Sequence, residues 1–75
     1  MHEAVTYHLI VSGLSGVLDA VSVNDTLQGL PGVHHAHTSA RTGRCVVDAD
    51  PTTCDPQQLA TALTIAGYPT EVEHP

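Results

Sequence analysis

Six apolar segments, separated by glycine or proline, constrain the fold of this chain more than any other feature of its sequence. Two of them have the character of helices, because apolar side chains recur in them at helical spacing. The first covers residues 16–28 and ends before Pro31. The second begins at Asp55, a capping residue followed by Pro56 at the first helical position, and ends at Gly67.

The other four segments have the composition of strands, because they are rich in β-branched and apolar side chains. They cover residues 4–12, 33–39, 44–50 and 69–73. The resulting order is strand, helix, strand, strand, helix, strand, which is the ferredoxin-like pattern. We therefore predict an α+β fold, a ferredoxin-like βαββαβ two-layer sandwich with an antiparallel sheet in the order 4-1-3-2. Both helices cover one face of this sheet, and the other face is open to solvent.

The length of 75 residues corresponds to a single domain, residues 1–75, with its core at about residues 4–73. Tyr7 and Tyr68 are the only aromatic residues, because the chain has neither Phe nor Trp. We therefore expect a core of Val, Leu, Ile and Ala side chains.

The charge balance argues against several classes of function. Two arginines stand against eight acidic residues, so the formal net charge is -6. Such a chain lacks the basic surface that nucleic acids require, and anionic membrane surfaces are disfavoured for the same reason. No apolar run approaches the ~20 residues of a membrane span, and the N-terminal residues do not resemble a signal peptide. We expect a cytoplasmic protein with no nucleic-acid partner and no membrane insertion.

Short motifs spread along the chain carry a family resemblance, because they keep a common spacing without a gap from about residue 6 to residue 73. These motifs are Val11-Ser12-Gly13-Leu14-Ser15, Leu30-Pro31-Gly32-Val33, Thr42-Gly43-Arg44, Asp50-Pro51 and Ala66-Gly67-Tyr68. In this spacing the sequence resembles heavy-metal-associated domains, the family of small copper chaperones, of the mercury-binding periplasmic protein and of the N-terminal modules of metal-pumping ATPases. The resemblance implies the ferredoxin-like fold and the binding of a metal ion.

The metal loop of that family joins the first strand to the first helix and reads Gly-Met-x-Cys-x-x-Cys. The resemblance implies that two thiolates there hold Cu(I), Zn(II) or Hg(II). In this sequence Leu14 replaces the methionine, Gly16 the first cysteine and Asp19 the second, while Tyr68 matches a position that packs beside the loop. The loop therefore offers either an anion site at the start of the helix or no site at all.

The two cysteines lie outside this loop. Cys45 alternates with the inward positions of the third strand, and Cys54 precedes the second helix. Residues 45–50 extend over about 17 Å as a strand, whereas a disulfide needs Cα atoms about 5.5 Å apart. We therefore expect two buried small hydrophobic side chains and no bridge.

Histidines at alternate positions mark the second strand. His35 and His37 point to the open face of the sheet if Ala36 and its alternate neighbour point to the core. If residues 41–44 form the turn, residues 40 and 45 pair. This register places His37 opposite Asp48 and His35 opposite Asp50.

The first strand adds His8, which points outward because Leu9 points inward. His8, Asp48 and His37 are then expected to form a row across three strands, with His35 beside it. Imidazoles together with a carboxylate suit Zn(II), Cu(II) or Ni(II). The predicted metal ligands are therefore His8, His35, His37 and Asp48.

Other interpretations of these histidines stay open at this point. The open face is otherwise a solvated surface with ordinary cross-strand pairs. Alternatively, Ile10 and Val46 also point outward and, with the histidines, form a protein contact or a homodimer interface. At the chain ends, His2 and His74 are candidate weak Cu(II) ligands, for which solvated termini are the simpler interpretation.

The sequence shows no nucleophile–base pair, phosphate loop or pair of catalytic carboxylates, so we expect no enzymatic activity. We predict a small, soluble, histidine-rich metal-binding protein that is metallochaperone-like or metal-sensing, with a Cu, Zn or Ni ion as its cofactor. Its partners are the metal ion and either a metal transporter or a second copy of itself. The alternative is a metal-independent interaction module that docks through the open sheet face.

Overall fold

A computed structural model of the chain describes residues 4–73. The elements follow the predicted order. They are β1 (Val5–Val11), α1 (Val17–Gln28), β2 (Val33–Thr38), β3 (Arg44–Ala49), α2 (Pro56–Ile65) and β4 (Thr70–Val72).

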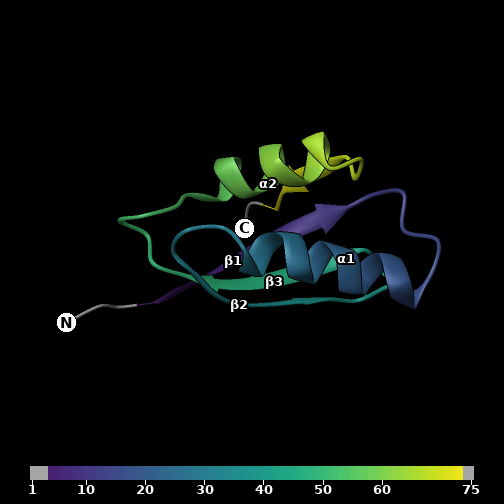
Figure 1. Cartoon of the computed structure of the whole chain (residues 1–75), viewed down its shortest axis with the longest axis horizontal. Coiled ribbons are helices and arrows are strands. Elements are labelled where there is room, and N and C mark those ends of the chain that lie inside the picture. Colours follow the sequence, from purple (N-terminus) through teal and green to yellow (C-terminus); the bar gives the residue numbers. More distant parts are fainter. Residues whose placement is uncertain (1–3, 74–75) are drawn as a thin grey trace.

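The four strands form one antiparallel sheet in the order β2-β3-β1-β4, which confirms the predicted ferredoxin-like fold. In Figure 1, α1 passes in front of β2 and β3, and α2 lies beside β4. Both helices pack on the same face of the sheet, so its other face is left open to solvent. Within residues 4–73, neither helix is long and apolar enough to cross a membrane.

The core lies between the sheet and the helices and is aliphatic, as the composition predicts. Strands contribute every second residue to it, and each helix contributes one apolar stripe. Its largest fully buried side chains are Leu9, Val23, Leu27, Cys45, Val47, Leu59 and Leu63.

The two helices begin differently. At α2 the Asp55 carboxylate accepts a hydrogen bond from the Gln58 backbone N–H at 2.9 Å, and the Gln58 side chain accepts one from the Asp55 N–H at 3.1 Å. This reciprocal capping box, with Pro56 after it, is the helix start that the sequence predicts. At α1 the cap residue is Gly16, which has no side chain to offer.

The turn between β2 and β3 sets the register of the histidine strand. Ser39 N–H donates to the Arg44 carbonyl at 2.9 Å, and Gly43 N–H donates to the Ser39 carbonyl at 2.9 Å. The turn therefore covers residues 40–43, one residue earlier than predicted. Gly43 has a φ of 76°, and a side chain on it would bring Cβ within 2.5 Å of the Val11 carbonyl oxygen. Glycine fixes the position of the turn for both reasons.

This shift corrects the predicted pairing of the histidines. His37 pairs with Val46, not with Asp48, and His35 pairs with Asp48, not with Asp50. Because the pairing moves by two residues, each side chain keeps its predicted face. A bulge between Val33 and His35 ends the regular ladder at the start of β2.

Candidate metal site on the open sheet face

The open face of the sheet presents the side chains at alternate positions of the four strands. They form a polar surface with a small apolar centre. The outward residues are Thr6, His8 and Ile10 on β1, His35 and His37 on β2, Arg44, Val46 and Asp48 on β3, and Glu71 on β4.

Two imidazoles lie next to each other on β2. His35 and His37 are exposed, whereas Ala36 and Thr38 between and after them are only 3% and 5% exposed. This alternation confirms that both histidines point away from the core. Side chains two residues apart on a strand have Cα atoms separated by about 6.6 Å. Rotation about the side-chain bonds can bring both imidazoles to one ion.

A carboxylate lies across from this pair. Asp48 on β3 pairs with His35 and is partly exposed. Its Oδ1 accepts a hydrogen bond from the Thr6 hydroxyl on β1 at 3.0 Å. His37 lies diagonal to Asp48, at a separation of about 7–8 Å between Cα atoms. His35, His37 and Asp48 therefore form one contiguous group on the face, which we call the His35–His37–Asp48 triplet.

His8 lies diagonal to Asp48 across β1 and β3, but it is not a neighbour of His37. Val46 pairs with His8 on one side and with His37 on the other, so the row across the sheet is His8, Val46, His37. The predicted row of His8, Asp48 and His37 is therefore wrong. Two strand spacings separate His8 from His37, or roughly 10 Å.

The triplet is not assembled as a metal site in the structure. Among residues 4–73, no three His, Cys, Asp or Glu side chains come close enough together to hold a metal ion. His2 and His74 lie outside the described residues.

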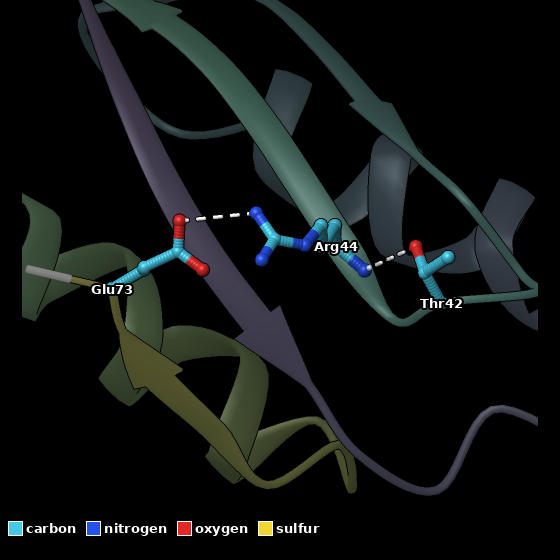
Figure 2. A network of polar contacts seen from close by, with 3 residues as sticks. All are labelled: Thr42, Arg44 and Glu73. Atoms are coloured by element: carbon cyan, nitrogen blue, oxygen red, sulfur yellow. Dashed lines mark hydrogen bonds and ion pairs between the residues drawn. The ribbon is translucent and has the colours of Figure 1, made fainter. Parts of the chain in front are cut away.

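The arginine of this face already has a partner. Arg44 Nη1 lies 3.1 Å from Glu73 Oε1, and Figure 2 shows its side chain reaching over β1 to the carboxylate. The Arg44 backbone N–H also donates to the Thr42 hydroxyl at 3.2 Å (Figure 2). The guanidinium charge is thus directed toward β4, away from β2 and its histidines.

The loop between β1 and α1, where the family resemblance implies a metal loop, is held by hydrogen bonds to Asp19 at the start of α1. The Asp19 carboxylate accepts hydrogen bonds from the Ser15 N–H at 2.7 Å, from the Ser15 hydroxyl at 2.6 Å and from the Tyr68 hydroxyl at 3.2 Å. The Ser15 hydrogen bonds, supported by Tyr68, hold the pKa of Asp19 below its usual value. The ionised Asp19 carboxylate already lies at this helix start, and its charge disfavours the second anion that was one of the predicted interpretations.

Sequence reasoning missed this arrangement, which we call the Ser15–Asp19–Tyr68 lock. The spacing of Ser15 and Asp19, four residues apart at a helix start, is a local signal for half of it. The Tyr68 hydroxyl comes from 49 residues away in the sequence, so the other half depends on the fold. The resemblance did place Tyr68 beside the loop, and the hydrogen bond to Asp19 confirms that position.

Both cysteines are buried thiols, as predicted. Cys45 is 1% exposed and Cys54 is 6% exposed, and neither forms a disulfide. Burial raises the pKa of both thiols, and the nearby Asp55 and Asp50 raise that of Cys54 further. The Thr38 hydroxyl lies 3.2 Å from the Cys45 sulfur. Protonated thiols inside the core are poor metal ligands.

Comparison with known proteins supports the fold. No family model matches the sequence, and no curated protein matches it. Among solved structures, oxidized MerP from Ralstonia metallidurans CH34 is 26% identical, with 96% of this chain and 100% of that chain covered and a TM-score of 0.88.

Two further solved structures give the same result. The N-terminal domain of PacS from Synechocystis PCC6803 is 27% identical over 95% of this chain and 100% of that chain, with a TM-score of 0.83. The CopZ metallochaperone is 25% identical over 92% of this chain and 100% of that chain, with a TM-score of 0.82. The chain therefore has a heavy-metal-associated-like fold, and it keeps this fold with no cysteine in the β1–α1 loop.

Proposed function

We propose that this protein binds a transition-metal ion through the imidazoles of His35 and His37, with Asp48 as the neighbouring carboxylate. The observation that carries the proposal is the contiguous triplet on the open face, with two exposed imidazoles on one strand and a carboxylate across from one of them. The likeness to the CopZ metallochaperone supports a role in binding, sensing or delivering the ion. Delivery would require a metal transporter as the partner.

The ligand chemistry favours certain ions. Imidazole nitrogen suits Zn(II), Cu(II) and Ni(II), whereas Cu(I) prefers thiolates. Both thiols of this chain are buried and protonated. We therefore propose a divalent ion of borderline softness as the ligand, with Zn(II) as the first to test.

The Asp48 carboxylate has two ways to contribute. Its Oδ1 is engaged by the Thr6 hydroxyl, which holds the carboxylate on the face. It can then ligate the ion directly, or it can accept the second ring N–H of His35 and orient that imidazole. We place His8 outside the coordination sphere because Val46 separates it from His37, which lies two strands away.

Titration of untagged, reduced protein with ZnCl₂ tests the proposal, with the imidazole resonances of each histidine followed by NMR. We expect the His35 and His37 resonances to shift together and saturate. His35→Ala and His37→Ala should each weaken zinc binding by about 100-fold or more, since loss of a residue that only orients a ligand already costs 10-fold to 100-fold. His34→Ala is the matched control, because His34 is exposed beside them but outside the triplet.

The opposite results would reject the proposal. Shifts confined to His2 and His74, or equal weakening by His34→Ala and His37→Ala, would show that no ion binds at the triplet. These histidines are exposed, so we expect each variant to fold, and circular dichroism checks this.

A further inference from the structure

We infer that a second copy of this chain completes the metal site, so that one ion is held by His35 and His37 from each of two copies whose open sheet faces lie against each other. This inference rests on the proposed function, because it needs the same two imidazoles as ligands. It adds the partner and the stoichiometry of one ion for two chains.

The number of ligands is the first argument. Structural zinc sites are almost always tetrahedral with four protein ligands. One copy supplies two imidazoles and one carboxylate whose Oδ1 already accepts a hydrogen bond from Thr6. No group of three such ligands is assembled anywhere in residues 4–73. A single copy therefore falls short of a full coordination sphere, and two copies of the pair supply four nitrogens.

The geometry of stacked sheets is the second argument. Sheets that pack face to face lie about 10 Å apart. An ion in the middle is then about 5 Å from each backbone plane, within reach of an imidazole on either sheet. A two-fold axis that crosses the strands at the level of Ala36 brings His35 of one copy over His37 of the other. The same operation repeats the contact, so all four imidazoles surround the axis.

The residues around the histidines fit such a contact. Val46, beside His37 in the row across the sheet, is 38% exposed, and Ile10 is a second partly exposed apolar side chain on this face. Asp48 lies where it can orient His35. Arg44 is paired with Glu73, so its charge is compensated and directed away from the ion (Figure 2).

The same surface is too weak an interface without the ion. Only Val46 and Ile10 offer outward apolar area on the open face of the sheet, as described for residues 4–73. Each copy also carries a net charge of -6, so two copies repel each other. A divalent cation between the faces offsets part of this repulsion. Association is therefore expected only when the ion is bound.

The edge of β2 does not provide another route to a dimer. Ala36 and Thr38 are the residues whose backbone groups point away from β3, because Ser39 N–H bonds to Arg44. Both residues are almost fully buried, at 3% and 5% exposed. The Gln28 side chain also reaches the Ala36 carbonyl at 3.5 Å and covers this edge. Two copies therefore meet through the open face and not by extending the sheet.

Sedimentation velocity with increasing ZnCl₂, together with the bound zinc measured after dialysis, tests the inference. We expect a monomer without metal and a dimer at half an equivalent of zinc per chain, with EDTA restoring the monomer. His37→Ala should remain monomeric at every zinc concentration, and His34→Ala should dimerise like the native chain.

A second pair of variants separates contact from ligation. Val46→Glu leaves all histidines in place but sets a second carboxylate over Asp48 of the other copy, so two like charges face each other and dimerisation should weaken by at least about 10-fold. Val17→Glu, at a position that is 72% exposed on α1, is the matched control and should dimerise normally.

Each result distinguishes this inference from the proposed function. A monomer that binds one zinc per chain at His35 and His37 would overturn the inference that a second copy completes the site, and it would leave the proposed function standing. A protein that binds no zinc at the triplet would overturn both. A dimer that forms equally in EDTA, or that Val46→Glu leaves intact, would also overturn the inference.

Discussion

Individual side chains explain why the β1–α1 loop of this protein keeps its shape without metal ligands. The Asp19 carboxylate takes three hydrogen bonds from two residues that lie far apart in the sequence. These contacts tie the start of α1 to the segment between α2 and β4. The lock thereby gives the loop a fixed shape that depends only on the chain itself.

The lock has a defined dependence on pH. Because the pKa of Asp19 is lower in the folded protein than in the unfolded chain, its ionised form stabilises the fold above the ordinary aspartate pKa of about 3.9. That contribution is lost as the pH falls through the lowered value. We expect urea denaturation curves of Asp19→Asn to show a weaker loss of stability between neutral and acidic pH than those of the native chain.

The separate donors of the lock make this prediction sharper. Ser15 contributes more than Tyr68 to lowering the pKa of Asp19. An NMR titration of the Asp19 carboxyl should therefore show a larger upward shift in Ser15→Ala than in Tyr68→Phe. If neither variant changes that pKa, the lock does not exist in solution.

The two buried thiols, Cys45 and Cys54, should react slowly with alkylating reagents. Burial raises their pKa, so they stay protonated at neutral pH and are shielded from reagents. We expect alkylation by iodoacetamide to be much slower in the native protein than in urea. Above a pH of about 8.5, ionisation of the thiols in the unfolded chain should lower stability. Alkylation as fast as that of a free thiol peptide would contradict the burial.

At the level of elements, the sequence was sufficient for the order, the type and the facing of every strand and helix. Alternation in β2 and β3 assigns each side chain to a face, and the Asp55 capping box marks the start of α2. The register between β2 and β3 was not predictable in the same way. A turn at residues 40–43 and a turn at residues 41–44 give every side chain the same face, so the apolar pattern does not distinguish them.

That register decided which residues are neighbours at the candidate site. The difference of one residue in the turn moved Asp48 from His37 to His35 and placed Val46 between His8 and His37. The histidines were found from the sequence because alternation alone reveals them. Their grouping was only partly found, because it depends on the position of Gly43, whose constraint comes from contact with β1.

Gly43 therefore offers a test at the scale of the hairpin. Gly43→Ala forces a side chain into a φ of 76° and within 2.5 Å of the Val11 carbonyl oxygen. We expect a loss of about 2 kcal/mol or more in the free energy of unfolding, measured in urea. Gly16→Ala is the matched control, since a side chain there meets nothing within 4 Å. Equal stability of the two variants would contradict the proposed origin of the turn.

On the scale of the whole molecule, the fold divides the chain into a layer that provides stability and a face that is available for function. The core uses aliphatic side chains and both cysteines, so the thiols serve packing. The polar groups that suit a metal ion lie on the opposite side of the sheet. The protein thus combines a heavy-metal-associated-like fold with histidines on the open face, and it has no cysteine in the β1–α1 loop.

X-ray absorption spectroscopy of the zinc-loaded protein tests ligation by these histidines most directly, because it identifies the atoms bound to the metal. Ligation by the histidines predicts only nitrogen or oxygen neighbours at about 2.0–2.1 Å, with the multiple-scattering pattern of imidazole. A shell of sulfur atoms at about 2.3 Å would contradict it, since the ion would then be held by the cysteines that we assign to the core.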